Sequence, residues 1–154
     1  MRLFRSLGLI AAGVLAGFAA ATIVMRRVLL SRGDAESDEI ALFAIFDGAK
    51  LQSRSQAFKG GSVLAWFGGV AVDLREAQLA PGAHLSLHSV LGGIAVRVPT
   101  GWRVESKAQA LGGGVEVNVP EPENPDAPTL TVDGFAAIGG IAIGARVADA
   151  AFDE

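Results

Sequence analysis

The stretch FGGVAVDL at 67–74 returns later in the chain as LGGIAVRV at 91–98, GGVEVNV at 113–119 and IGGIAIG at 138–144. A weaker copy, FDGAKLQS, lies at 46–53. The copies are 21, 24, 21 and 26 residues apart when they are aligned on one position, which is Asp47, Gly68, Gly92, Gly113 and Gly139. A repeat of about 20 to 50 residues is typical of stacked folds, in which each unit packs on its neighbours.

Apolar and polar residues alternate after each glycine pair. In the copy at 67–74, Val70, Val72 and Leu74 share one face of an extended strand, and Ala71 and Asp73 share the other. Alternation with a period of two, rich in β-branched residues, indicates half-buried strands. Two strands of about six residues and their corners fill one period. The sequence therefore predicts an all-β domain over 40–147, a β-solenoid of about five rungs, with an antiparallel sandwich of hairpins as the alternative.

The repeat also predicts a register. Aligned copies place one outward residue on each of five successive rungs, in the order Gln52, Asp73, Arg97, Asn118 and Gly144. Neighbouring Cα atoms in such a column are about 5 Å apart. We therefore expect Asp73 and Arg97 to pair on a solvated outer face, while Val72 and Val96 stack inside. The proline-rich segment PEPENPDAP at 120–128 is expected to loop out, because proline cannot join a sheet interior.

Residues 1–30 are predicted to be an N-terminal membrane anchor with one transmembrane helix. The 20 residues from Ser6 to Met25 carry no charge, and as a helix they span about 30 Å, the thickness of the hydrocarbon core. We expect residues 7–25 to contact the lipid bilayer. The polar residues 31–39 then form a tether, and 148–154 form an acidic tail.

Three questions about this anchor stay open in the sequence. A cleaved signal peptide with its small-residue exit at Ala19–Ala21 is the alternative to a single-pass anchor. Gly13 and Gly17 have the spacing that lets two helices pack closely, so a homo-oligomer is a further expectation. Arginines on the two sides of the apolar segment nearly balance, and the small excess after it favours a cytoplasmic C-terminal domain.

Charge and composition exclude several classes of function. Residues 1–33 hold five of the 13 Lys and Arg and none of the 16 Asp and Glu, so the basic anchor precedes an acidic domain. An acidic domain repels phosphate backbones, and we expect no nucleic acid partner. The chain has no cysteine, which excludes a disulfide scaffold, a thiolate nucleophile and cysteine-ligated zinc.

The repeats resemble the C-terminal domain of the LiaF-like family, the cell-wall-active antibiotic response proteins of bacterial envelopes. The resemblance lies in WFGGVAVDLREAQL at 66–79, VLGGIAVRVPTGWRVE at 90–105, LGGGVEV at 111–117 and IGGIAI at 138–143. It implies a β-helix-like fold, sometimes called a toast-rack, and a role in sensing envelope stress. The founding member is a membrane inhibitor of a two-component sensor kinase, but it has several spanning segments where this chain has one.

No catalytic, metal or cofactor set is predicted from the residues. His84 and His88 would lie about 13 Å apart along a strand, too far to share an ion. Ser86 lies between them, but both imidazoles are at the wrong reach for a nucleophilic site and no buried carboxylate is evident. LGGGVEV at 111–117 is followed by a strand, whereas phosphate loops lead into a helix.

Two further groups are assigned structural roles. Asp73, Arg75 and Glu76 are interpreted as a solvated face with pairing between rungs, and Trp102 and Trp66 as caps on the core. The sequence thus predicts a membrane-anchored, non-enzymatic binding or regulatory protein of the envelope-stress response, whose partner is an envelope or signalling protein. The alternative is a self-associating structural scaffold at the membrane, as in bactofilin-like β-helices.

Overall fold

The computed structural model describes residues 34–46 and 48–145, and these residues form strands and turns without a helix. No segment among them is a helix long and apolar enough to cross a membrane. The predicted anchor over 1–30, the first residues of the tether and the acidic tail over 148–154 lie outside the described residues. The nine strands are β1 (Glu39–Ala44), β2 (Ala49–Gln52), β3 (Phe58–Ala65), β4 (Gly69–Asp73), β5 (Leu79–Arg97), β6 (Arg103–Ser106), β7 (Gln109–Ala110), β8 (Gly114–Asn118) and β9 (Thr129–Gly144).

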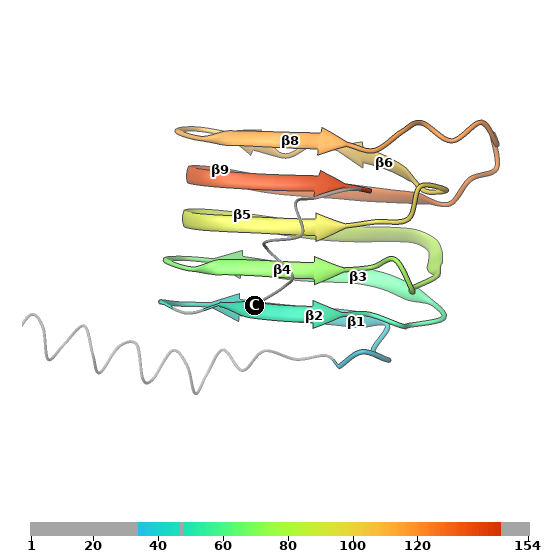
Figure 1. Cartoon of the computed structure of the whole chain (residues 1–154), viewed down its shortest axis with the longest axis horizontal. Coiled ribbons are helices and arrows are strands. Elements are labelled where there is room, and N and C mark those ends of the chain that lie inside the picture. The colour runs from blue at the N-terminus through green and yellow to red at the C-terminus, as the bar shows by residue number, and fades with distance from the viewer. Residues whose placement is uncertain (1–33, 47, 146–154) are drawn as a thin grey trace, which may run out of the picture. The chain divides into compact units, whose positions relative to one another are not determined.

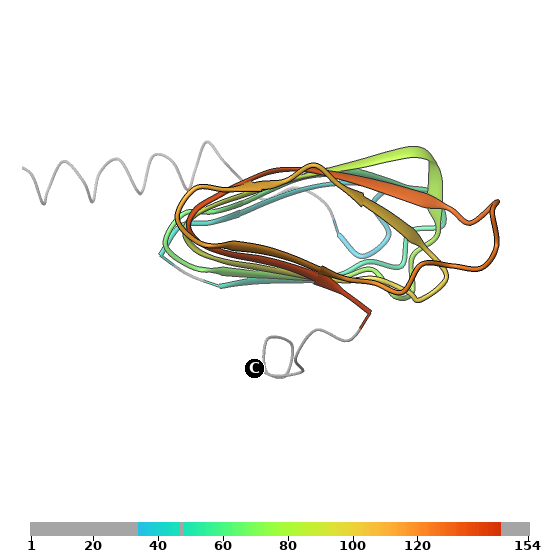
Figure 2. The ribbon, with the colours of Figure 1, turned by 90° about the horizontal axis from the view of Figure 1, so that it is seen from above.

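Every ladder between these strands is parallel. One layer holds β1, β3, the first half of β5, the first half of β9, and β6 with β7; the other holds β2, β4, the second halves of β5 and β9, and β8. Each turn of the chain thus contributes a strand to both layers, which lie face to face in Figure 2. This arrangement is consistent with the predicted β-solenoid, and the antiparallel sandwich is wrong for the described residues.

The predicted register is confirmed, but the predicted order of the rungs is wrong. Gln52 pairs with Asp73, and Asp73 with Arg97, as expected. Arg97 then pairs with Gly144 rather than with Asn118, and Asn118 pairs with Gly144 from the other side. The rung of β9 is therefore inserted between the rung of β5 and the rung of β6, β7 and β8, which ends the stack (Figure 1).

The polarity of the two last copies explains this exchange. β9 carries one charged residue, Asp133, and its inward residues are almost completely buried. The β6–β8 rung carries Glu105 and Glu116, and its burial pattern is mostly exposed. An apolar copy is stabilised by neighbours on both sides, whereas a polar copy tolerates water on one side. The loop at 119–128 has no strand, as expected from its prolines. It carries the chain back into the stack.

The inward residues form one continuous core, as the alternation predicted. Val72, Val96 and Val63 are inaccessible to solvent. Trp102 is 5% exposed and belongs to the same core, which confirms its predicted role. On the end rung, Val117 is 40% exposed, because no further rung of the described residues covers it.

The first glycine of each pair is explained by the distance between rungs. A Cβ on Gly92 would lie 2.0 Å from the carbonyl oxygen of Gly68, and a Cβ on Gly139 would lie 2.0 Å from that of Gly92. Each such Cβ would point toward the preceding rung of the stack.

Candidate functional site

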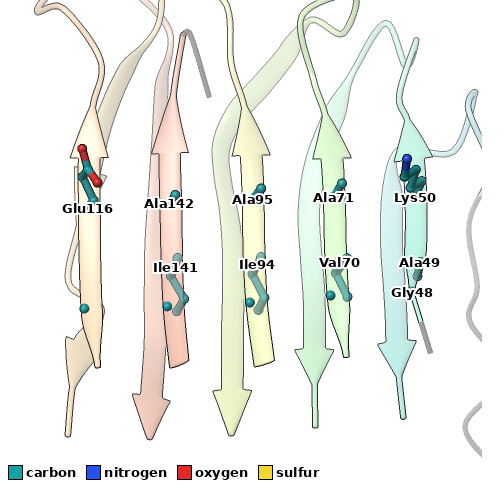
Figure 3. A pocket seen from close by; sticks show the side chains of 14 residues that line it. Gly48, Ala49, Lys50, Val70, Ala71, Ile94, Ala95, Glu116, Ile141 and Ala142 are labelled. Atoms are coloured by element: carbon teal, nitrogen blue, oxygen red, sulfur yellow. The ribbon is translucent and has the colours of Figure 1, made fainter. Parts of the chain in front are cut away.

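The outer face of the β2, β4, β5, β9 and β8 layer bears a groove with a volume of about 630 Å³. The groove runs across the strands, from the first rung to the last (Figure 3). One column along it is made of the glycines Gly48, Gly69, Gly93, Gly140 and Gly114. The next outward column consists of Lys50, Ala71, Ala95, Ala142 and Glu116. We call these two columns the small-residue groove.

The groove combines an apolar centre with a charged residue at each end. Ala71 is buried, and Ala95 and Ala142 are half-buried. Lys50 lies at the end on β2, and Glu116 lies at the end on β8. Because the central residues carry no side chain beyond Cβ, the backbone of another segment can approach the sheet closely. The alternation of the sequence contains this column, but its small side chains were interpreted only as an outer face.

Asp73 and Arg97 lie in the column beside the groove, and their burial differs from the predicted solvated face. Both are on the outward side, yet Asp73 is 7% and Arg97 is 6% exposed, so the expected solvated face is wrong at this point. The expected contact between the two side chains is confirmed, but it is long, with 3.9 Å between Arg97 Nη1 and Asp73 Oδ2. The closer partner of Asp73 is Arg75 of the same rung, whose Nη2 donates to Oδ2 at 2.7 Å.

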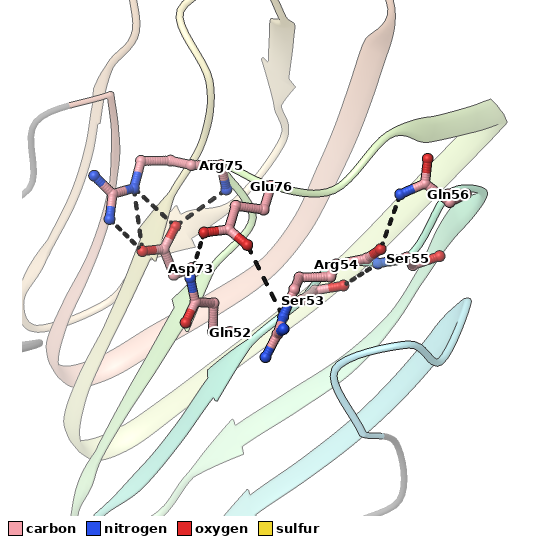
Figure 4. A network of polar contacts seen from close by, with 8 residues as sticks. All are labelled: Gln52, Ser53, Arg54, Ser55, Gln56, Asp73, Arg75 and Glu76. Atoms are coloured by element: carbon pink, nitrogen blue, oxygen red, sulfur yellow. Dashed lines mark hydrogen bonds and ion pairs between the residues drawn. The ribbon is translucent and has the colours of Figure 1, made fainter.

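This carboxylate is held in its charged form. Burial raises the pKa of Asp73, but hydrogen bonds from the side chain and backbone of Arg75, with the charges of Arg75 and Arg97, outweigh burial and lower the pKa below its usual value. The neighbouring Glu76 joins two rungs, because it accepts a hydrogen bond from Gln52 at 3.0 Å and lies 3.9 Å from Arg54 (Figure 4). The predicted pairing between rungs is therefore confirmed for Glu76.

A second polar cluster lies on the outer face of the other layer. Asp133 of β9 accepts a hydrogen bond from Ser86 at 2.6 Å and lies 2.9 Å from Nε2 of His84. The hydrogen bond from Ser86 is the largest influence on the pKa of Asp133 and lowers it. Burial is the next largest and raises this pKa, and His84 acts in the same direction as Ser86, so the pKa stays below its usual value. The sequence alone does not bring this carboxylate to Ser86, because Asp133 is 47 residues from Ser86 and meets it only through the β5–β9 ladder.

The cluster does not have the arrangement of a nucleophilic site. Asp133 stands between Ser86 and His84, whereas an activated serine needs the imidazole next to its hydroxyl. His88 packs instead against the ring of Phe135, with a centroid separation of 5.1 Å. Within the described residues, no group of three or more His, Asp or Glu could hold a metal ion.

The interpretation of Trp66 as a cap on the core is wrong. Its side chain is 40% exposed at the turn between β3 and β4, whereas Trp102 is buried. The glycine-rich stretch at 111–117 leads into β8, a strand, as expected.

Comparison with protein-family models, with curated proteins and with solved structures finds no match for this chain.

Proposed function

We propose that this chain is a membrane-anchored, non-enzymatic regulatory protein whose solenoid domain binds a segment of a partner protein in the small-residue groove. The groove itself carries the proposal. It crosses five strands, which corresponds to about 19 Å at the usual strand spacing. That length accommodates about 13 residues of a helix. A helix laid in an apolar groove is a common mode of peptide recognition.

The chemistry of the groove defines the segment it would take. The glycines and the alanines Ala71, Ala95 and Ala142 offer a flat apolar floor. A segment with apolar residues on one face matches this floor, and polar residues at its two ends match the polar ends of the groove. Few polar groups face the centre, which favours a peptide over a charged small molecule.

The resemblance of the repeats to the LiaF-like domain supports a role in the envelope. Together with the apolar residues 7–25, it supports a single-pass protein that responds to damage by cell-wall-active antibiotics. The partner is then an envelope or signalling protein in or at the same membrane. The Asp133 cluster supports a non-enzymatic role, because its serine is hydrogen-bonded to a carboxylate rather than to an imidazole.

A complementation experiment tests the groove. Cells that lack the protein are given the full chain with Ala95→Arg, and the transcriptional response to a cell-wall-active antibiotic is measured. We expect no restoration, because the arginine fills the centre of the groove. Ser62→Arg is the matched control, since Ser62 is also half-buried and outward on a central strand, but on the other layer. Full restoration by Ala95→Arg would contradict the proposal.

Photo-cross-linking gives the physical counterpart of this test. A photoreactive residue at Ala142, in the groove, should trap one discrete adduct in intact membranes, and the same residue at Ser62 should not. Adding Ala95→Arg to the Ala142 probe should remove that adduct. An adduct that persists with the arginine present would show that the trapped protein lies elsewhere on the surface.

The scaffold remains the second candidate, and one observation favours it. Within the described residues, β2 and β8 each have one neighbouring strand, so both ends of the stack present a strand edge. Parallel edges of this kind can pair with a second copy. Sedimentation of the full chain in detergent separates the candidates, because a scaffold forms large assemblies and a regulatory protein stays small.

A further inference from the structure

The described residues contain eight large hydrophobic side chains that are exposed, and six of them gather at one corner of the stack. The corner is the turn that joins the two layers in every rung, where the strands end at the left in Figure 1. Five of these side chains form a line that we call the apolar edge: Phe46, Phe67, Leu91, Ile138 and Leu111. The sixth, Trp66, is the neighbour of Phe67.

The register of the sheet makes this line continuous. Leu91 pairs with Ile138, and its backbone N–H donates to the carbonyl of Trp66 at 2.7 Å. The rings of Phe46 and Phe67 stack with their centroids 4.7 Å apart. Leu111, on the end rung, donates its N–H to Ala136, next to the turn that holds Ile138. Every rung thus adds one apolar side chain at the same corner.

The edge is almost free of charge in a domain that is otherwise rich in carboxylates. The turns at 65–69, 89–93, 110–114 and 136–140 contain no charged residue, and the first turn contains only Asp47, which lies outside the described residues. Exposure falls from 51% at Phe46 to 38% at Leu91 in the middle of the stack and is highest, at 79%, for Leu111 on the end rung. The five side chains are contiguous along one line rather than scattered singly over the surface, and single scattered apolar side chains are the ordinary case on a solvated surface.

We infer that the apolar edge lies in the interface of a zwitterionic lipid bilayer, the same bilayer that the proposed anchor enters. This inference rests on the anchor in the proposed function and goes beyond it, because the edge is separate from the small-residue groove. Tryptophan side chains are favoured at the level of the lipid headgroups, and Trp, Phe and Leu form the buried face of segments that lie in the membrane interface. A weak surface contact of this size becomes effective when a second element already holds the protein at the membrane.

The size of the edge favours a lipid surface over a second copy of the chain. Four rung spacings of about 4.8 Å and a width of about 10 Å give an area of about 200 Å². A stable protein interface needs about 800 Å² from each partner. The edge therefore supplies too little area for a dimer on its own.

The linking segment is long enough for this contact. Met25, the end of the apolar segment, is nine residues before Asp34, so the link spans at most about 30 Å. β1 extends over six residues toward the corner, which corresponds to about 20 Å. The proposed anchor and the apolar edge can therefore reach the surface of the same bilayer.

Single-cysteine labelling tests the inference in the full chain, which has no cysteine of its own. A polarity-sensitive fluorophore is attached at Ile138→Cys or Leu111→Cys, and the protein is reconstituted into phosphatidylcholine vesicles. We expect a blue shift of the emission and strong quenching by lipids brominated in the acyl chain. Glu123→Cys is the matched control, because Glu123 is also exposed but lies in the loop at 119–128. Its label should show neither change.

An intrinsic probe checks that labelling has not created the contact. In the Trp102→Phe variant, Trp66 is the remaining tryptophan, and brominated lipid should quench its fluorescence. In the Trp66→Phe variant, the fluorescence of the buried Trp102 should be quenched much less. A sodium carbonate wash separates the two proposals. If the wash removes the chain from the vesicles, the proposed anchor is wrong. If the chain stays on the vesicles but the labels at 111 and 138 are exposed to water, only the proposed contact of the apolar edge is wrong.

Two further outcomes distinguish the occupant. Lipid contact should persist when the protein-to-lipid ratio is lowered, and loss of the blue shift on dilution would overturn the inference in favour of a second copy. The contact should also weaken in vesicles rich in phosphatidylglycerol, because the domain is acidic. A contact that grew stronger with anionic lipid would show that basic residues elsewhere, rather than the apolar edge, drive it.

Discussion

Replacing Gly92 with alanine is expected to destabilise the domain by about 3–5 kcal/mol, while the same change at the adjacent Gly93 is expected to alter stability by less than about 1 kcal/mol. The two residues are both half-buried and lie at the same corner of β5. A Cβ on Gly92 would lie 2.0 Å from the carbonyl oxygen of Gly68, whereas a Cβ on Gly93 would lie 3.9 Å from that of Gly140. Only the first of these positions lacks room.

The magnitude follows from what must move. Ordinary contact begins at 3.4 Å, so the rungs at Gly92 would have to separate by more than an ångström. Two hydrogen bonds join the rungs there, from Leu91 N–H to Trp66 at 2.7 Å and from Gly93 N–H to Gly68 at 3.1 Å. Their loss costs about 1 kcal/mol each, and overpacking adds about 1–3 kcal/mol. This is a large part of a total stability of about 5–15 kcal/mol.

Urea unfolding of the full chain in detergent, followed by the β-sheet circular dichroism band, measures the difference. The midpoint for Gly92→Ala should fall by about 1–4 M relative to Gly93→Ala. If Gly92→Ala does not fold, the adjacent residues Gly113 and Gly114 of the end rung provide a second pair, since a Cβ on Gly113 would overlap the carbonyl oxygen of Gly139 and a Cβ on Gly114 would meet nothing within 4 Å. Equal midpoints for Gly92→Ala and Gly93→Ala would refute the explanation of the glycine repeat by rung spacing.

Three further changes test the core and the buried charges. Val96→Asp should unfold the domain in a thermal melt, because Val96 is inaccessible to solvent and an unpaired buried carboxylate costs several kcal/mol; a melting temperature close to the wild type would contradict the inward assignment. Trp102→Ala should cost about 3–5 kcal/mol in urea unfolding, and Trp66→Ala, at 40% exposure, much less; equal losses would count against the assigned burial. The folded-state pKa of Asp73 is lowered, so its stabilisation is present above the unfolded pKa of about 3.9 and is lost as the pH falls through the folded value. Asp73→Asn should therefore cost about 1–3 kcal/mol at pH 7 and flatten the acid limb of the stability curve, and an unchanged acid limb would exclude this role.

The candidate site was predicted only in part. The outward column of Ala71, Ala95 and Ala142 follows from the alternation of the sequence, because side chains on a strand change face at every residue. That this column forms a groove depends on which copies become neighbours. The cluster of Asp133 with Ser86 and His84 could not be predicted, since it needs the pairing of β5 with β9 across 47 residues.

The sequence by itself determined the strands, their inward faces and the register of Gln52, Asp73 and Arg97, because a period of two and an aligned glycine pair act locally in each copy. The tertiary structure alone decided that β9 lies inside the stack and that the β6–β8 rung ends it. It also decided that Asp73 and Arg97 are buried and that Trp66 is exposed. These outcomes depend on which apolar surfaces are removed from water by distant neighbours, and the pattern within one copy does not contain that information.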